Sequence, residues 1–338
     1  RLGCLAPMKL SGVRVLDLSL FLPGPMLTLM MADHGAEVIK VEPVGEGEPT
    51  RHVGYRKGSE SVWFRNTHRG KQSIQLNLKD PADHAVFMAL AAEADVVVEA
   101  FRPGVVTRLG VGYDAVRAVN PGVVYCAISA FGQDGPYRDR PAHDVAVQAL
   151  AGVVSLNEGQ DGLPAMPAMP VADALASLTA LSGVLMALLR KRETGLGDYV
   201  DVAMFDSVLA WTPNVTGRIF ATGEPHVVKD ERSWGGNAMY GLYRTADDRW
   251  LALGGAEVKF ARNLLTPLGA EDLIPYAELP PGPGQEPLRA YLRELFATRT
   301  LAHWQVWFTD KDVCWAPVRT LKDAFDDPAL EARGMLAR

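Results

Sequence analysis

Short apolar runs alternate with stretches of helical spacing over roughly the first 130 residues of the chain. The runs are four to seven residues long and rich in valine, isoleucine and leucine, which is typical of strands buried on both faces of a parallel sheet. Regular alternation of such strands with helices predicts an α/β fold. We expect the strands of this sheet at residues 14–18, 38–41, 73–76, 95–99 and 123–129.

The stretches between and after these strands predict helices. Residues 25–34 are expected to form a helix that ends at Gly35 in the left-handed conformation, which glycine adopts without strain. Residues 81–94 are expected to form a second helix, capped by Asp80 with Pro81 at its first position. Residues 174–189 carry six leucines at helical spacing and no proline, so they predict a long helix.

The pattern changes near residue 216, where the chain becomes looser and more polar. A strand at 199–202 and a helix at 204–211 are expected before this point. We therefore predict a large domain over residues 1–215 and a small domain with its linkers over 216–310. Residues 311–338 show strand and helix character again, and we expect them to return to the large domain. The small domain is expected to contain strands at 241–244 and 250–253 and helices at 258–265 and 287–296.

The composition of the 338-residue chain points to a globular protein with small-molecule partners. Its hydrophobic content of 48% can build a large core, and its net charge of −6, with dispersed lysines and arginines, favours neither nucleic acid nor an anionic membrane. Cys4, Cys126 and Cys314 are far apart, which disfavours both a disulfide framework and a zinc site. No apolar run approaches ~20 residues and no signal peptide is visible. We therefore expect a cytoplasmic protein without a metal or a membrane span.

The turn after the first strand disfavours a dinucleotide-binding dehydrogenase. It reads Ser-Leu-Phe-Leu-Pro-Gly-Pro over residues 19–25, with one glycine where the G-x-G-x-x-G motif has three. Pro23 and Pro25 also remove N–H donors that would bind a pyrophosphate. Glu42, at the end of the second strand, imitates the acid that binds a ribose, but the rest of the motif is missing. The sequence also lacks the P-loop, H-E-x-x-H and G-x-S-x-G motifs.

Two arginines follow the strand that ends at Glu99. Arg102 and Arg108 lie six residues apart in a loop at the carboxyl end of a predicted parallel strand, where α/β sheets bind their ligands. Guanidinium groups bind phosphates through charge-assisted hydrogen bonds, so each arginine is a candidate phosphate ligand. The alternative is that both are ordinary solvated charges on a surface loop.

A combination of segments spread along the chain is more specific than any one of them. The segments are Leu-Ser-Gly-Val-Arg-Val-Leu-Asp at 10–17, Gly-Ala-Glu-Val-Ile-Lys-Val-Glu at 35–42, Arg-Gly-Lys-Gln-Ser at 69–73, the loop stretches 101–104 and 108–110, Phe-Gly-Gln-Asp-Gly-Pro at 131–136, and residues 195–206. With this combination the chain resembles the class III, or CaiB/BaiF-type, CoA-transferase family over nearly its whole length. That family includes formyl-CoA transferase, carnitine CoA-transferase and α-methylacyl-CoA racemase.

The resemblance implies a fold, a substrate and a set of site residues. The expected fold is α/β, with a Rossmann-like large domain, an inserted smaller α/β domain, and two chains interlocked as a homodimer with the active site at their interface. The expected substrates are an acyl-CoA and a small carboxylic acid, and no tightly bound cofactor is expected beyond the coenzyme A of the substrate. By position, Asp173 matches the catalytic aspartate and Arg108 an arginine that contacts CoA. The other positions implied in CoA binding are Phe21, Lys40, Leu76, Ala100, Phe101 and Arg102.

Carboxylate chemistry agrees with the role that the resemblance implies for Asp173. Acyl transfer from a thioester to this side chain gives an anhydride that the released CoA thiolate can reopen, which divides one difficult step into easier ones. Backbone N–H groups at the start of the helix are expected to keep the carboxylate ionised. The alternative is that Asp173 only caps the helix, which is a common role for an aspartate at this position.

The same fold supports a second reaction, in which a proton α to the thioester carbonyl is removed and then returned from the opposite face. His143 stands where the racemases of the family carry their catalytic histidine, and Glu257 matches a glutamate that supports it. The segments 170–173 and 148–152 instead have forms common in the transferases. We therefore predict a CoA-transferase with a covalent aspartyl intermediate on Asp173, and a 2-methylacyl-CoA racemase that uses His143 and Asp173 is the alternative.

Overall fold

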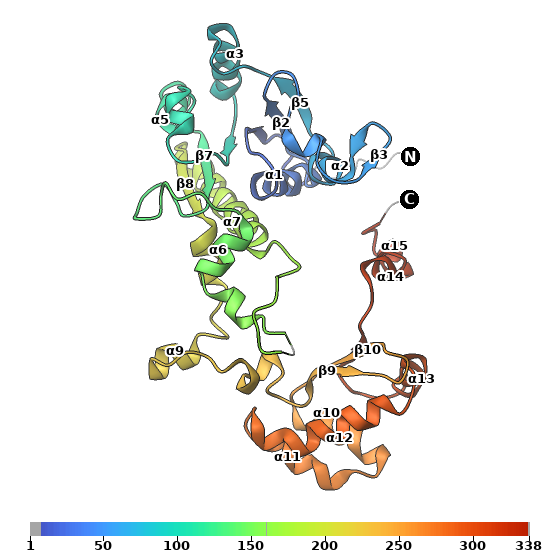
Figure 1. The fold of residues 1–338 in the computed structure, drawn as a ribbon. Coiled ribbons are helices and arrows are strands. Elements are labelled where there is room, and N and C mark those ends of the chain that lie inside the picture. Colours follow the sequence, from blue (N-terminus) through green and yellow to red (C-terminus); the bar gives the residue numbers. More distant parts are fainter. Residues whose placement is uncertain (1–7, 160, 337–338) are drawn as a thin grey trace. The chain divides into compact units, whose positions relative to one another are not determined.

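The computed structural model describes residues 8–159 and 161–336, so Cys4 lies outside the described residues (Figure 1). Contacts within the chain divide it into two units, Arg1–Thr216 and Gly217–Arg338. This division falls one residue from the boundary expected between the large and small domains.

A six-stranded parallel sheet forms the centre of the first unit (Figure 1). Its strands are β1 (Arg14–Asp17), β2 (Glu37–Glu42), β5 (Gln72–Gln75), β6 (Val96–Glu99), β7 (Val124–Ser129) and β8 (Asp198–Ala203). Their order is β5-β2-β1-β6-β7-β8, and Val15 of β1 pairs with Val38 of β2 on one side and Val96 of β6 on the other. The chain thus winds outward from β1 and then returns to β6, which is the strand order of the Rossmann fold. The predicted α/β fold with a parallel sheet is confirmed.

Helices cover both faces of this sheet. They include α1 (Pro23–Asp33), α3 (Pro81–Ala92), α5 (Tyr113–Val119), α7 (Val171–Thr194) and α8 (Met204–Ala210). On one face, Val15 and Val96 pack in a core with residues of α1 and α7, and on the other, Leu16 and Val97 pack in a second core with residues of α3 and α5. Successive strand residues point to opposite faces, so one apolar run supplies both cores.

The predicted stop of α1 at Gly35 and the predicted start of α3 after Asp80 are confirmed. The side chain of Asp80 accepts hydrogen bonds from the N–H groups of Ala82, at 2.8 Å, and Asp83, at 3.3 Å. Gly35 follows α1 with a φ of +94°, and a Cβ there would lie 2.5 Å from the Cβ of Met8. Both its backbone conformation and its surroundings therefore require glycine.

Helix α7 is longer than expected, and it corrects one reading of the sequence. Its 24 residues contain an 18-residue window of mean hydropathy 1.8, so by length and composition alone the helix could cross a membrane. The expectation that no apolar run approaches that length was therefore wrong, because the single Asp173 does not interrupt the run. A face of small residues packs into the core beside the sheet, as in a core helix of a folded domain. This face consists of Ala172, Ala176, Ala180, Val184 and Ala187.

The second unit is built on a three-stranded antiparallel sheet of order β11-β10-β9. Its strands are β9 (Tyr240–Arg244), β10 (Trp250–Gly254) and β11 (Trp315–Pro317), and its larger helices are α10 (Val258–Leu265), α12 (Glu286–Ala297) and α13 (Leu301–Trp307). Leu251 of β10 packs in one core with Leu264 of α10, Leu292 of α12 and Trp304 of α13. This unit therefore has a core of its own.

Strand β11 corrects the expected return of residues 311–338 to the large domain. Ala316 pairs with Ala252 of β10, and the ring of Trp315 stacks on Phe308 with centroids 4.4 Å apart. These contacts lie within the second unit, which also contains α14 (Leu321–Phe325) and α15 (Pro328–Ala332). Strand and helix character does not reveal which sheet a strand joins, because tertiary contacts decide the pairing.

Several short elements were not expected from the sequence pattern. An apolar repeat needs about two turns before its period is visible. The unexpected helices, α5 and α13 included, have seven residues or fewer. The other elements of this kind are α2 (Val62–His68), α4 (Val105–Arg108), α6 (Asp144–Leu150), α9 (Gly217–Thr222), α11 (Ile274–Glu278) and the small hairpin of β3 (Arg56–Lys57) and β4 (Glu60–Ser61).

Candidate active site

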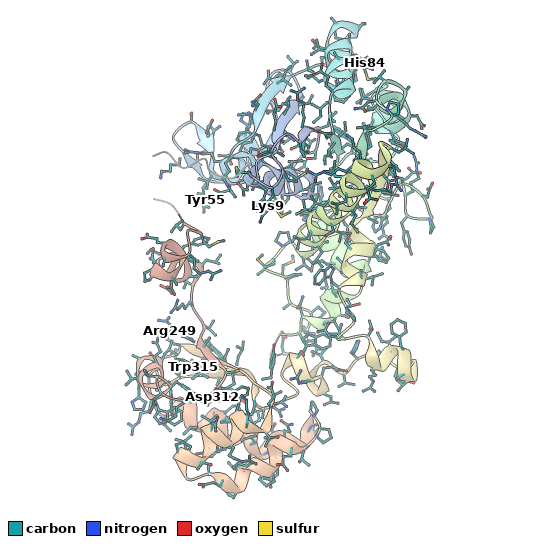
Figure 2. The ribbon with its side chains drawn as sticks, turned by 180° about the vertical axis from the view of Figure 1, so that it is seen from behind. Lys9, Tyr55, His84, Arg249, Asp312 and Trp315 are labelled. Atoms are coloured by element: carbon teal, nitrogen blue, oxygen red, sulfur yellow. The ribbon has the colours of Figure 1, made fainter. Side chains whose placement is uncertain are left out.

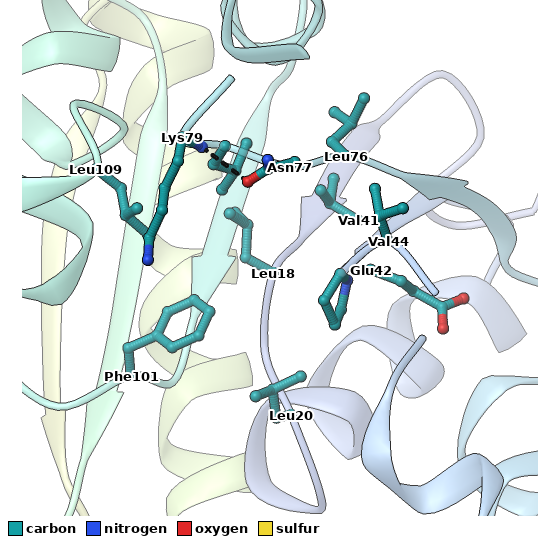
Figure 3. A pocket seen from close by; sticks show the side chains of 12 residues that line it. Leu18, Leu20, Val41, Glu42, Val44, Leu76, Asn77, Lys79, Phe101 and Leu109 are labelled. Atoms are coloured by element: carbon teal, nitrogen blue, oxygen red, sulfur yellow. Dashed lines mark hydrogen bonds between the residues drawn. The ribbon is translucent and has the colours of Figure 1, made fainter. Parts of the chain in front are cut away.

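A cavity of about 450 Å³ lies at the carboxyl ends of β1, β2, β5 and β6, where the strand order reverses (Figure 3). Its wall is mostly apolar, with Leu18 and Leu20 after β1, Leu76 after β5 and Phe101 after β6. Glu42 of β2 is among its few polar side chains. Open α/β sheets bind their ligands at such a switch point, so this cavity is the first candidate for a binding site.

A second cavity of about 390 Å³ adjoins the first, because the two share Leu78, Lys79 and Leu109 in their walls. Arg108 and His84 also line it, and His84 projects from α3 (Figure 2). The Nε2 atom of His84 lies 3.1 Å from a backbone carbonyl oxygen. An apolar cavity beside a basic one suits a ligand with both uncharged and anionic parts.

Two arginines meet beside these cavities at Gly104. This glycine has a φ of +81°, and a Cβ there would lie 3.3 Å from Nη1 of Arg108 and 3.5 Å from Nη2 of Arg138. Arg138 is held by its other nitrogen atoms, because Nε donates to the carbonyl oxygen of Gln133 and Nη1 donates to Asp139, both at 2.8 Å. Within residues 8–159 and 161–336, the guanidinium group of Arg108 makes no hydrogen bond or ion pair. Two guanidinium edges that approach one glycine suit an anionic group.

Some of the residues predicted to bind CoA line these cavities. Leu76 and Phe101 line the apolar cavity, and Arg108 lines the basic one. Arg102 is exposed in the same loop, whereas Ala100 packs against the core beneath it. The binding of CoA by these residues stays a prediction.

Phe21 occupies a strained position on the turn after β1. Its φ is +62°, a region that residues other than glycine rarely adopt. Its N–H donates to Oε1 of the fully buried Glu48, at 2.8 Å. The partly exposed ring makes an edge contact with His143, with centroids 6.4 Å apart. Phe21 therefore links the turn beside the apolar cavity to the start of α6.

Lys40 corrects the predicted set of CoA-binding residues. Its side chain is 1% exposed, and its Nζ lies 3.3 Å from Oδ1 of Asp17 and also donates to the carbonyl oxygen of Ser19. Lys71 binds the other oxygen of Asp17 at 3.1 Å. Burial alone would raise the pKa of Asp17, but the two ammonium groups lower it well below its usual range. Lys40 is thus part of a buried charge cluster, and the prediction that it contacts CoA is wrong.

Asp173 lies in the first turn of α7 but does not cap it. The N–H groups of Ala172 and Asp173 donate instead to Oδ1 of Asp144, at 2.8 and 3.2 Å. Burial, and then the charge of Asp144, raise the pKa of Asp173 from 3.8 to about 7. The expectation that the helix N–H groups keep Asp173 ionised is therefore wrong, because a second carboxylate occupies them.

His143 and Glu257, the two residues of the predicted racemase pair, lie in different units. His143 is exposed and directly precedes Asp144 at the start of α6. Glu257 is exposed and directly precedes α10. The support of His143 by Glu257 stays a prediction.

Sequence reasoning missed four residues of this site, namely Lys79, His84, Arg138 and Asp144. Lys79 lies four residues after β5, so the strand-end rule that identified Arg108 could have found it. Asp144 gave no such signal, because its hydrogen bond to Ala172 joins residues 28 positions apart.

Known proteins resemble the chain over nearly its whole length. Residues 10–338 match the model of CoA-transferase family III. The chain is 32% identical to an acetyl-CoA:oxalate CoA-transferase of Acetobacter aceti, over 97% of this chain and 85% of the relative, and 33% identical to a succinyl-CoA–D-citramalate CoA-transferase of Chloroflexus aurantiacus, over 97% and 82%. A crystal structure of a CaiB/BaiF family protein from Brucella suis is similar with a TM-score of 0.84 and 28% identity, over 97% of this chain and 89% of that one. The chain therefore belongs to CoA-transferase family III and is an enzyme of the CoA-transferase type.

Proposed function

We propose that the enzyme moves CoA between an acyl-CoA and a free carboxylate, with Asp173 as the covalent nucleophile. The observation that carries this proposal is the environment of the Asp173 carboxylate. It is largely buried, its pKa is raised to about 7, and in the described part of the chain no donor bonds its oxygen atoms. A carboxylate that only caps a helix would be bonded to the helix N–H groups, whereas a desolvated and unbonded one is reactive once ionised.

The proposed reaction begins when a carboxylate oxygen of Asp173 attacks the carbonyl carbon of the thioester. The carbon–sulfur bond breaks, CoA leaves as a thiolate, and an acyl-aspartyl anhydride remains. The thiolate then attacks the aspartyl carbonyl carbon, which releases the donor acid as a carboxylate and leaves an aspartyl thioester of CoA. The acceptor carboxylate reverses these steps, so that the new acyl-CoA forms and Asp173 is restored. No step transfers a proton, so the cycle requires no general base.

We assign the CoA nucleotide to the two adjoining cavities. Lys79, Arg108 and Arg138 supply positive charge for its phosphate groups, and each charge-assisted hydrogen bond contributes about 1.5–3 kcal/mol. Leu76 and Phe101 supply an apolar surface for its uncharged part. Binding energy from this distant part can then be used at the reacting carbonyl group.

We also propose that the enzyme is a homodimer, as the family resemblance implied. Helix α7 buries its small residues, but Leu178, Met186 and Leu189 on its other side are 44%, 64% and 62% exposed. Exposed leucine and methionine side chains along a 24-residue helix favour a covering partner. A second copy of the chain is the partner that we propose for this side of the helix.

For the acids, we propose small carboxylates and dicarboxylates in particular. Relatives that resemble the chain are named for oxalate, D-citramalate and glutarate, all of which carry two carboxyl groups. The test incubates the enzyme with a panel of acyl-CoA thioesters and free acids in deuterated water, followed by mass spectrometry. A new acyl-CoA supports the proposal. Deuterium at the α-carbon without a new thioester contradicts it and indicates a racemase.

The variant His143→Phe separates the same two reactions at one residue. A racemase needs an acid or base here, and its loss lowers the rate by about 10²–10⁴. The proposed transfer needs only a ring that fits against Phe21, so we expect this variant and Glu257→Gln to keep most of the transfer activity. A loss of transfer greater than about a hundredfold, with CoA binding intact, would favour proton chemistry.

A further inference from the structure

Gln148 is a buried polar residue with no direct part in the proposed reaction. It lies on α6 with 1% of its surface exposed. Its Nε2 donates to Oδ2 of Asp144, at 2.6 Å, and to the carbonyl oxygen of Met169, at 3.2 Å. A buried amide is costly unless it is bonded, and these two bonds use both of its N–H groups. Gln148 therefore joins the Asp144 carboxylate to the segment that leads into α7.

Asp144 performs the capping that the residue before α7 cannot perform. The helix is preceded by Pro170, which has no side-chain acceptor, and no side-chain cap is present there. Oδ1 of Asp144 accepts from the N–H groups of Ala172 and Asp173 instead. Two of the four N–H groups that a helix start leaves free are thus bonded by a residue of another helix.

This arrangement keeps the helix N–H groups away from the Asp173 carboxylate. A carboxylate in the first turn would otherwise compete for them, because they are its nearest donors. Other charged groups on the elements around α7 act elsewhere, since Asp206 at the start of α8 acts on Asp201, and Asp33 at the end of α1 pairs with Arg69. Asp144, preceded by the exposed His143, is the charge that acts on Asp173.

We propose that Gln148 is a positioning residue for acyl transfer, which holds Asp144 on the helix N–H groups and so leaves the Asp173 carboxylate unbonded and able to attack the thioester. The inference rests on the proposed role of Asp173 as the nucleophile. A neutral amide suits this task because it bonds Asp144 without cancelling its charge. When the amide is lost, Asp144 can turn away and Asp173 can bond the freed N–H groups, which stabilises its anion and weakens it as a nucleophile.

The test compares Gln148→Met and Gln148→Asn with the control Gln305→Met. Methionine has nearly the volume of glutamine but no donor, and asparagine keeps the amide on a side chain too short to reach both partners. Gln305 is exposed on α13, so its replacement controls for the chemical change alone. For each variant, kcat and KM are measured from about pH 5 to about pH 9, and thermal unfolding is followed in parallel.

We expect Gln148→Met to lower kcat about 10- to 100-fold while KM for the acyl-CoA changes less than about threefold. We also expect the acid limb of the kcat profile to move to lower pH, because the Asp173 anion gains the helix N–H groups. A residue needed only for folding would lower the unfolding temperature without moving that limb. Gln148→Asn gives the same comparison if the methionine variant does not fold.

Two outcomes separate this inference from the proposed function. If kcat and its acid limb are unchanged in the Gln148 variants while Asp173→Ala is inactive, the positioning role is wrong and the nucleophile stands. If Asp173→Ala retains transfer activity, the proposed function itself is wrong.

Discussion

The protonation of Asp173 decides how much of the enzyme is ready to react at a given pH. Burial and Asp144 raise its pKa to about 7, and only the ionised carboxylate can attack a thioester. We therefore expect kcat to fall about tenfold per pH unit below about pH 7 and to level off above it. A profile measured with saturating acyl-CoA tests this. A constant kcat down to about pH 5 would contradict a nucleophile with this pKa.

The same raised pKa predicts that Asp173 destabilises the folded protein at neutral and higher pH. Its pKa is 3.8 ordinarily and about 7 in the folded protein. Between these pH values the folded state therefore binds more protons than the unfolded state. The free energy of unfolding falls as the pH rises through this range. We expect Asp173→Asn to be inactive but about 2–4 kcal/mol more stable than the parent at about pH 8, with little difference near pH 4. Urea unfolding at both pH values measures this. If the variant and the parent differ by the same free energy of unfolding at both pH values, folding does not raise the pKa of Asp173.

At the residue scale, the sequence pattern identified candidate residues that lie at the end of a single helix or strand. Asp173 stands at a helix start and Arg108 follows a strand end, and both were found in this way. The burial of Lys40 could not be predicted from its own strand, because its ion-pair partner Asp17 lies on a neighbouring strand. The capping of α7 by Asp144 was equally invisible, since no sequence pattern records a contact across 28 residues.

At the scale of an element, the loop around Gly104 is expected to bind phosphate through Arg108 and Arg138. We predict that Arg108→Ala and Arg138→Ala each weaken CoA binding about 10- to 100-fold, because each removes one charge-assisted contact. Arg117→Ala on α5 is a matched control on an exposed arginine. Calorimetry with CoA and with CoA lacking its 3′-phosphate shows which phosphate is bound. Unchanged affinity in the double variant would contradict the assignment of this loop.

Strands and long helices were predictable as elements because their apolar patterns extend over enough residues. The five expected strands of the first 130 residues or so all lie within one or two positions of β1, β2, β5, β6 and β7. The short helix α6 was not predicted, although α8, which also has seven residues, was expected from the sequence. That omission mattered, because α6 carries both Asp144 and Gln148.

At the scale of the whole molecule, the order of the strands and the pairing of β11 depended on contacts that the sequence does not display. Alternation of strands and helices indicates a parallel sheet but leaves many orders open. The family resemblance implied a Rossmann-like large domain, and it also implied a catalytic role for Asp173. The resemblance did not prevent the wrong assignment of residues 311–338, because Trp315–Pro317 reads as a strand in either domain.

The exposed side of α7 leads to a prediction about assembly. If a second copy covers Met186 and Leu189, light scattering should give twice the mass of one chain, and a double change of these two residues to glutamate should bury charge in the interface. We expect the dissociation constant of the dimer to rise at least about 100-fold in this variant. If the active site needs both copies, the monomeric variant also loses transfer activity. The matched control is Val119→Glu. Val119 is 48% exposed and lies on α5, a helix that packs on the other face of the sheet. A parent protein that is monomeric and active at assay concentration would contradict the dimer, and a dimeric glutamate variant would move the interface away from this side of α7.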